Sequence, residues 1–242
     1  AVGRVLARAL KVFDFAAPSI PLQPGHTIVS DVSQLAAIAR ETAGKTVAID
    51  FETTGLRFAD GDHPIGVAIG YLPPGSWPRC WYVPVAHRTG TNVSVSAACA
   101  LTEDVAAAAP EVIGHNIKFD LNMARANNWQ IPADKPVHCT MVQAYMIDEQ
   151  QYLSLEKLAA AHLTLPWDPW YGKTAVDAFV NNRAKANKLG RKAYLRRYGH
   201  AEVPVGLEGP YSCLDAAHTL LLHAHQRDEA MGLGTPYEAR RR

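Results

Sequence analysis

The segment 46–52 constrains the fold more than any other, because acidic and apolar side chains alternate along it. Side chains of a β-strand point alternately to its two faces, so Asp50 and Glu52 share one face and the apolar side chains share the other. The apolar set is Val47, Ile49 and Phe51. Neighbouring carboxylates at the end of a buried strand repel each other unless cations neutralise them, and their oxygens suit Mg²⁺ or Mn²⁺. The segment therefore indicates a metal site, although an acidic turn after a strand has the same pattern.

The order of the other expected elements favours an α/β domain with a mixed sheet. Strands are expected at 46–52, 64–71 and 80–85, and the turn-rich segments between them suggest an antiparallel meander. Further short strands are expected at 112–114 and 137–139. Helices are expected at about 31–42, 95–109, 118–127, 141–147 and 155–162.

Composition places the chain among ordinary globular proteins. Apolar residues make up 48% and charged residues 19% of its 242 residues, which excludes a disordered, collagenous or coiled-coil protein. No stretch approaches the roughly 20 apolar residues of a membrane span, so no membrane partner is expected. The four cysteines are far apart and form no Cys-x-x-Cys pair, which predicts reduced thiols in a cytoplasmic protein.

We expect one domain over 26–242, preceded by an N-terminal lead over 1–25. In this lead, apolar residues at helical spacing between Val2 and Phe13 favour a short surface helix over a targeting peptide. The net charge of +1 argues against a protein devoted wholly to coating nucleic acid. It conceals a basic insert at about 173–202, where eight basic residues face two acidic ones, a local charge of +6. This insert is either a solvated helical face or a surface for a nucleic-acid backbone.

A second acidic motif follows the expected strand 112–114. There the chain passes into a helix, and Asn116 and Asp120 are four residues apart. Residues at this spacing share one side of a helix, so both side chains can face the same neighbour. The alternative interpretation is an ordinary N-cap at Asn116 and a solvated acid at Asp120.

A third motif lies near the C-terminus, in the segment 209–222. Pro210 is expected to begin a helix at its first position, and Tyr211 and Asp215, again four residues apart, share one face. The alternative is an acid that complements the helix dipole beside a half-buried tyrosine.

The three motifs in this order resemble the DEDD exonuclease superfamily in its Tyr-containing branch. Within that branch the chain is similar to the 3′→5′ proofreading domain of family A (polymerase I type) DNA polymerases, including phage forms. The resemblance runs from about Thr46 to His225, and the segments 115–121 and 152–159 also look like that family. It implies a ribonuclease H-like fold, in which helices flank a five-stranded mixed sheet with three antiparallel strands.

The resemblance also implies the roles of individual residues. Two Mg²⁺ ions, replaceable by Mn²⁺, would be held by Asp50, Glu52, Asp120 and Asp215. Such ions activate the attacking water and stabilise the leaving oxygen. Tyr211 would orient that water, since its ordinary pKa of about 10 makes it a poor base at neutral pH. Contacts to the substrate would come from Thr53, Thr54, Leu56 as an apolar wedge, Asn116, and Arg191 and Lys192 of the basic insert.

The implied activity is removal of nucleoside 5′-monophosphates from the 3′ end of single-stranded or frayed DNA, in proofreading for a DNA polymerase. The chain ends about 27 residues after Asp215, so the polymerase is expected on a separate chain or in a part from which this domain was excised. Two alternatives stay open. One is a 3′→5′ exoribonuclease of the ribonuclease D type, and the other is a catalytically silent module that binds nucleic acid or a polymerase.

Overall fold

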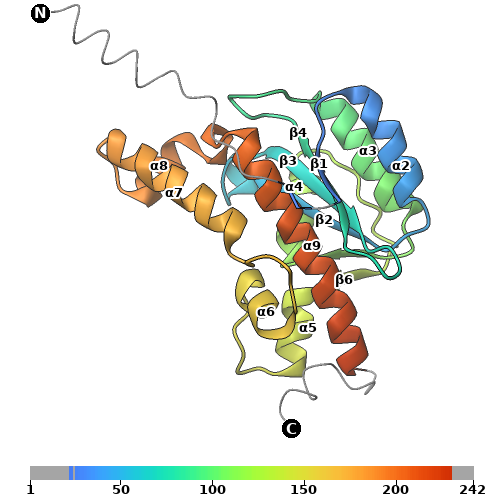
Figure 1. Cartoon of the computed structure of the whole chain (residues 1–242). Helices are drawn as coiled ribbons and strands as arrows, with labels where there is room; N and C mark the ends of the chain where they lie inside the picture. The colour runs from blue at the N-terminus through green and yellow to red at the C-terminus, as the bar shows by residue number, and fades with distance from the viewer. Residues whose placement is uncertain (1–21, 24, 231–242) are drawn as a thin grey trace, which may run out of the picture.

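The computed structural model describes residues 22, 23 and 25–230, so the helix expected between Val2 and Phe13 lies outside the described residues. A six-stranded sheet in the order β1-β4-β3-β2-β5-β6 forms the centre of the molecule (Figure 1). Its strands are β1 (His26–Ile28), β2 (Val47–Thr53), β3 (Pro64–Tyr71), β4 (Arg79–Pro84), β5 (Val112–Gly114) and β6 (Val137–Cys139). The helices are α2 (Leu35–Thr42), α3 (Val95–Ala108), α4 (Ile117–Ala126), α5 (Thr140–Ile147), α6 (Leu155–His162), α7 (Tyr171–Ala186), α8 (Arg191–Tyr198) and α9 (Val205–Ala230).

The sheet is mixed, as the order of elements predicts. Strands β2, β3 and β4 form an antiparallel meander, whereas β5 pairs parallel to β2 and β6 pairs parallel to β5. These five strands have the arrangement expected of a ribonuclease H-like sheet. The sixth strand, β1, pairs parallel to β4 and was not expected. Its three residues, His26 to Ile28, are too few to show the alternation that identifies a strand.

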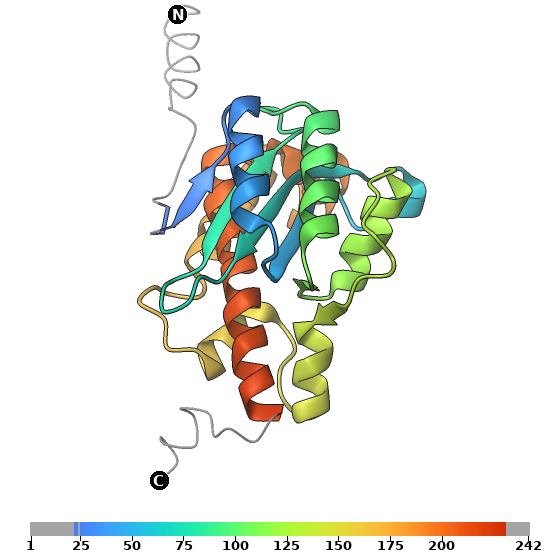
Figure 2. The same ribbon diagram turned by 90° about the vertical axis from the view of Figure 1, so that its right-hand side faces the viewer.

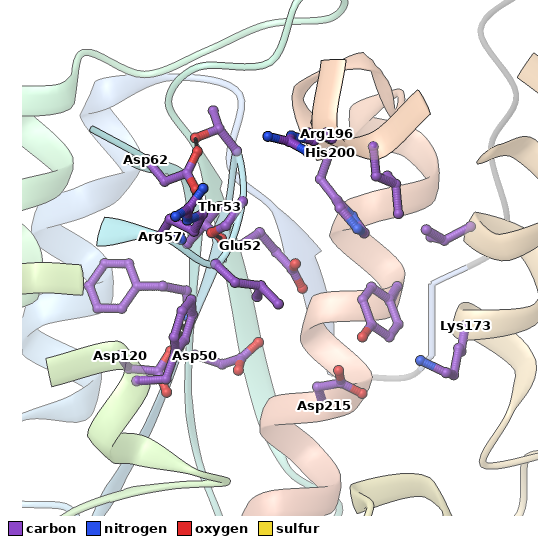
Figure 3. A pocket seen from close by; sticks show the side chains of 18 of the residues that line it. Asp50, Glu52, Thr53, Arg57, Asp62, Asp120, Lys173, Arg196, His200 and Asp215 are labelled. Carbon is purple, nitrogen blue, oxygen red and sulfur yellow. Dashed lines mark hydrogen bonds between the residues drawn. The ribbon is translucent and has the colours of Figure 1, made fainter. Parts of the chain in front are cut away.

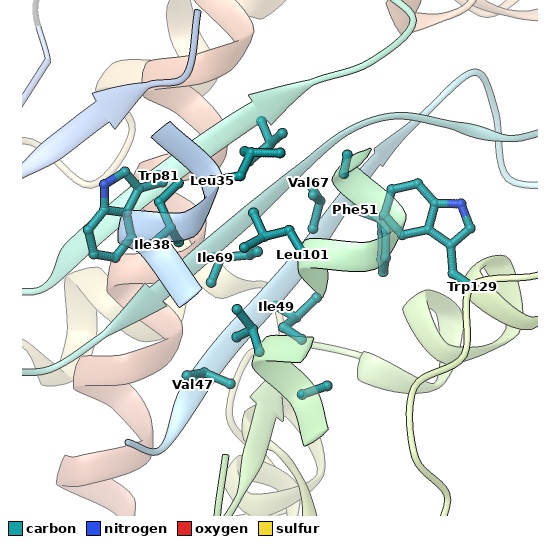
Figure 4. Close-up of a cluster of buried hydrophobic side chains, with 14 of the residues drawn as sticks. Leu35, Ile38, Val47, Ile49, Phe51, Val67, Ile69, Trp81, Leu101 and Trp129 are labelled. Carbon is teal, nitrogen blue, oxygen red and sulfur yellow. The ribbon is translucent and has the colours of Figure 1, made fainter. Parts of the chain in front are cut away.

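Helices cover both faces of the sheet. Helices α2 and α3 lie side by side on one face (Figure 2), and the long helix α9 crosses the other. The apolar face of β2 points toward α2 and α3, where Ile49 and Phe51 are buried with Ile38 and Leu101 (Figure 4). On the opposite face, Ala48 is buried against α9. The alternation along β2 therefore has the predicted consequence: the carboxylates leave the main core and turn toward the side that α9 covers.

A capping box begins the 3₁₀ turn Val32–Gln34 that precedes α2. The Asp31 carboxylate accepts a hydrogen bond from the Ser33 amide at 2.7 Å, and the Gln34 side chain accepts one from the Asp31 amide at 3.0 Å. These bonds satisfy amides that have no partner within the helical turn Val32–Gln34, which runs directly into α2.

Replacement of Asp31 by alanine is expected to lower the Tm by a few degrees, because it removes the side-chain oxygen that accepts the N-cap hydrogen bond. Thermal unfolding followed by circular dichroism measures it. Asp31→Asn is the matched control, because its amide oxygen still accepts the bond; an equal loss in both variants would show that the charge, not the cap, matters.

Helix α9 begins earlier than the sequence predicts. It starts at Val205, and Pro210 lies inside it rather than at its first position. Proline is poorly tolerated there because it lacks the N–H of a helical hydrogen bond, its ring crowds the carbonyl four residues earlier, and it also clashes with the N–H and Cβ of the preceding residue. The preceding residue is Gly209, which has no Cβ, and a Cβ there would also lie 2.7 Å from Ile28 Cγ1. The glycine therefore permits both the proline and the close approach of α9 to β1.

The basic insert folds as helices α7 and α8, followed by the 3₁₀ turn His200–Glu202. This helical arm projects beside the first half of α9 (Figure 1). A small apolar cluster of its own, which includes Val180, Tyr194 and Leu207, fixes it to α9. Within the described part of the chain, no helix has the length and apolar character of a membrane span.

Candidate active site

A pocket of about 760 Å³ opens at the C-terminal end of β2, between α4, α9 and the helical arm (Figure 3). Most of the side chains expected at the site line it: Asp50, Glu52, Thr53, Thr54, Leu56, Asp120, Arg191, Tyr211 and Asp215. Asn116 and Lys192 are exposed and are not among the described residues that line the pocket. Asn116 instead stands at the start of α4 in a left-handed conformation, with a φ of 59°.

Four carboxylates meet in this pocket. Asp50, Glu52 and Asp215 each offer an oxygen, and these oxygens lie within 4.8 Å of one another. Asp120 lies beside Asp50, and its Oδ1 accepts a hydrogen bond from the Phe51 amide at 3.0 Å. This bond spans from α4 to β2, so it holds the helix start against the end of the strand.

Burial and mutual repulsion make the cluster costly to ionise. Burial raises the pKa of Asp50 to about 6. Burial, and then the charges of neighbouring carboxylates, raise the pKa values of Glu52, Asp120 and Asp215 well above their ordinary range. Divalent cations would remove this cost, and an all-oxygen donor set is the one that Mg²⁺ and Mn²⁺ accept. The donors present therefore fit a divalent-metal centre.

Helix α9 supplies two hydroxyl groups to the same cluster. The Tyr211 hydroxyl hydrogen-bonds with Asp215, one turn further along. Ser212 Oγ donates to Asp50 Oδ2 at 3.5 Å. Burial raises the pKa of Tyr211 well above 10, so its hydroxyl is neutral and can donate or accept a hydrogen bond. Sequence reasoning identified Tyr211 but missed Ser212, whose position next to a motif tyrosine carries no signal of its own.

Two more titratable groups, Glu208 and His200, were not predicted from the sequence. Glu208 is fully buried, and its Oε1 lies 3.0 Å from His200 Nδ1. It lies three residues before Tyr211, so in a helix it belongs to the face that carries the site. Because the helix was expected to begin at Pro210, Glu208 was not expected to lie on its face or in the site.

Cationic side chains of α7 and α8 form the opposite wall of the pocket. Lys173 Nζ lies 3.2 Å from Glu156 Oε1, which ties α7 to α6. Burial alone would lower the pKa of Lys173, but nearby carboxylates, Glu156 foremost, raise it, so the ammonium stays charged beside Asp215. Arg191 is paired with Asp177 at 2.6 Å, and Arg196 is exposed at the rim. A phosphate between these walls would face cations on one side and metal-binding carboxylates on the other.

A mixed sheet with acidic side chains at the end of its central strand, faced by basic helices, defines a nuclease of the ribonuclease H-like class. Comparison with known proteins agrees: a protein-family model for 3′-5′ exonucleases matches residues 26–227. The chain therefore belongs to the 3′-5′ exonuclease family, in the polymerase-proofreading type of the DEDD superfamily. The resemblance seen in the sequence is confirmed.

Among curated relatives, the chain is similar to two phage enzymes that are both named DNA polymerase DpoZ. It is 30% identical over 186 residues to that of Salmonella phage PMBT28, which covers 76% of this chain and 26% of the relative. It is 36% identical over 104 residues to that of Acinetobacter phage SH-Ab 15497, which covers 43% of this chain and 15% of the relative. The chain thus spans about a quarter or less of the length of these polymerases.

Two solved structures are similar over most of the chain. The structure titled "apo form of the nuclease" has 21% identity and a TM-score of 0.47, and the match covers 86% of this chain and 79% of the other. The Nibbler EXO domain of Aedes aegypti has 10% identity and a TM-score of 0.49, with 90% and 95% covered.

Proposed function

We propose that the chain is a metal-dependent exodeoxyribonuclease that removes nucleoside 5′-monophosphates from the 3′ end of single-stranded or frayed DNA. The observation that carries this proposal is the convergence of the carboxylate oxygens of Asp50, Glu52 and Asp215 within 4.8 Å of one another, with Asp120 lining the same pocket, in a chain from the 3′-5′ exonuclease family. Their oxygens would hold two Mg²⁺ ions, and Mn²⁺ would replace them because it accepts the same ligands.

When bound, two such ions supply a hydroxide nucleophile and stabilise the departing oxygen during in-line displacement at phosphorus. The chain's own residues do the positioning. The Phe51 amide fixes Asp120, and Ser212 orients Asp50, so the ligand oxygens are held in place before substrate arrives. The neutral Tyr211 hydroxyl would orient the attacking water by a hydrogen bond, since deprotonating this buried phenol is unfavourable.

The loop after β2 would receive the terminal nucleotide. Leu56 is 78% exposed at the pocket rim, which suits an apolar wedge against the last bases. The hydroxyl of Thr53 donates to Gly55 O at 2.7 Å, and that of Thr54 donates to Asp62 Oδ1 at 3.0 Å. Both hydroxyls are already engaged, and so is the Thr54 amide, which donates to His63 O at 3.0 Å. We therefore infer that Thr53 and Thr54 shape the loop that receives the terminal sugar and phosphate. Asn116 and Lys192 would contact only nucleotides beyond the pocket.

A DNA polymerase is the proposed partner. Both phage relatives are DNA polymerases, and the chain matches only a part of each. We infer that the exonuclease acts beside a polymerase, either within a longer protein or as a separate chain, and removes mispaired 3′ ends.

The activity is tested with a 5′-labelled single-stranded oligonucleotide and Mg²⁺. We expect a ladder of products shortened from the 3′ end and release of nucleoside 5′-monophosphates, with no ladder in EDTA. An RNA oligonucleotide of matched sequence is expected to be degraded much more slowly. If RNA is cleaved faster than DNA, RNA is the preferred substrate and the DNA assignment is wrong. If neither oligonucleotide is cleaved, the nuclease assignment is overturned.

The helical arm is expected to act on binding rather than on chemistry. Replacement of Arg196 by alanine removes an exposed cation at the pocket rim that is not one of the expected metal ligands, so KM should rise about 3–10-fold with kcat unchanged. Loss of one phosphate contact should also reduce the slope of log K for DNA binding against log salt concentration by about one. Steady-state kinetics and salt titrations measure both effects. Lys185→Ala, on an exposed part of α7 outside the pocket, is the matched control; equal effects in the two variants would contradict a specific contact.

A further inference from the structure

Beside the four carboxylates lies a second group of potential metal ligands. Glu52, His200 and Glu208 each offer one ligand atom, and these atoms lie within 4.8 Å of one another. They come from three separate elements: the end of β2, the 3₁₀ turn His200–Glu202 after α8, and the first half of α9. This group shares only Glu52 with the group of Asp50, Glu52 and Asp215.

We propose that Glu52, His200 and Glu208 form a further cation site, which takes a divalent transition-metal ion such as Mn²⁺ or Zn²⁺ and is distinct from the two-ion catalytic centre. Imidazole nitrogen is a good ligand for these ions and a poor one for Mg²⁺, which prefers oxygen and water. The donor set of one nitrogen and two carboxylates therefore separates this site from the neighbouring all-oxygen cluster.

One oxygen of the buried Glu208 carboxylate lacks a hydrogen-bond partner among the described residues. Glu208 has no solvent exposure, and among the described residues its Oε2 has no hydrogen-bond partner. A buried carboxylate oxygen left in this state is costly. Its other oxygen, Oε1, lies 3.0 Å from His200 Nδ1, and one oxygen of this carboxylate lies within 4.8 Å of the ligand atoms of Glu52 and His200. A cation among the three side chains that is held by both oxygens of Glu208 would satisfy Oε2.

The spacing of the ligand atoms suits an ion of this size. Metal–ligand bonds of about 2.0–2.2 Å place neighbouring ligand atoms about 3 Å apart and opposite ones about 4.2 Å apart. His200 Nδ1 and Glu208 Oε1 are 3.0 Å apart, and all three ligand atoms fall within 4.8 Å. Three protein ligands leave the remaining positions to water, as in other open metal sites.

The position of His200 gives the ion a structural consequence. The preceding residue, Gly199, has a φ of 68°, and a Cβ there would lie 2.5 Å from Thr54 O, so only glycine lets the turn approach the chain just after β2 so closely. An ion at this place would hold the helical arm, which ends in this turn, against the end of β2. Occupancy of the site would then couple metal binding to the placement of Arg191 and Arg196.

The test is Mn²⁺ binding to the whole chain, measured by electron paramagnetic resonance without any substrate. We expect bound Mn²⁺ to show a ¹⁴N coupling from a histidine, because the partner of His200 Nδ1, Glu208, belongs to the same ligand set, so the ion can bind both side chains at once. His115 also lines the pocket, but its two ring nitrogens lie 2.9 Å from Thr140 Oγ1 and from Leu153 O. The coupling should vanish in His200→Gln and persist in His63→Gln, an exposed histidine outside the pocket.

Two further variants separate this site from the catalytic one. Glu208→Gln should bind one Mn²⁺ fewer than the unaltered chain, whereas Asp215→Asn should weaken the oxygen cluster and keep the ¹⁴N coupling. Absence of that coupling in the unaltered chain would overturn the proposal whatever the variants do. So would an unchanged ion count in both His200→Gln and Glu208→Gln. None of these measurements depends on cleavage. The cation-site proposal can therefore be overturned while the exonuclease proposal stands, and the exonuclease proposal can be overturned while the cation site stands.

Discussion

Replacement of Asp50 or Asp215 by alanine is expected to slow DNA cleavage by about 10³-fold or more while DNA binding changes little. Each variant removes a ligand from the oxygen cluster, and the bound ions contribute several kcal/mol of charge stabilisation in the transition state. Each 1.36 kcal/mol lost is a factor of ten in rate. Binding should survive because the basic arm and the loop after β2 are unaltered. Single-turnover cleavage and a separate binding titration in Ca²⁺ measure the two quantities.

Both variants should fold as stably as the unaltered chain. Both carboxylates carry raised pKa values because burial and neighbouring charges oppose their ionisation, so their removal relieves repulsion. The metal-free Tm is therefore expected to stay equal or to rise. Asp60→Ala is the matched control, because Asp60 lines the same pocket but is exposed and paired with Arg57. Cleavage at the natural rate in both Asp50→Ala and Asp215→Ala would remove the metal-site assignment.

The sequence predicts the central strand and its carboxylates because their pattern is local. Alternation along β2 determines which side chains enter the core, and the four-residue spacing of Tyr211 and Asp215 holds in any helix, wherever that helix begins. Turn residues likewise mark β3 and β4, whose bounds match the prediction within one residue. Features of this kind are decided by a few neighbouring residues, so single-sequence reasoning reaches them.

The features that sequence reasoning missed depend on contacts between distant segments. Strand β1 exists because three residues pair with β4, which lies more than 50 residues away. Helix α9 begins at Val205, before Pro210, and its first half packs so closely on β1 that a Cβ at Gly209 would lie 2.7 Å from Ile28 Cγ1. Misplacing the helix start then hid Glu208, although its spacing from Tyr211 would have placed it on the site. His200 reaches the strand only through the fold of the arm.

In the absence of divalent ions, the carboxyls of Asp50 and Glu208 should stabilise the folded state at about pH 5 and lose this contribution by about pH 8. Buried histidines such as His218 and His223, whose pKa values burial lowers to about 4, contribute in the opposite direction. Burial raises the pKa of Asp50 from 3.8 to about 6, and it raises that of Glu208 from 4.5 to about 8. A raised carboxyl pKa means that the folded state binds the proton more tightly than the unfolded state. The resulting stabilisation is complete below the ordinary pKa and is lost as the pH rises through the folded value. For the two groups together its loss over this interval is about 5 kcal/mol, or roughly 10–20 °C in Tm.

Divalent ions should reverse this trend, because they bind the ionised carboxylates and so compete with protons. Mg²⁺ or Mn²⁺ is therefore expected to raise the Tm by several degrees at about pH 8 and by much less at about pH 5. Thermal unfolding in EDTA and in excess metal at both pH values measures the difference. Relative to the unaltered chain, Asp50→Asn should lose the part of the pH dependence near 6, and Glu208→Gln should lose the part near 8, since each removes one titrating group. If the Tm of both variants depends on pH as that of the unaltered chain does, this would contradict the raised pKa values and, with them, the electrostatic reason for metal binding at this site.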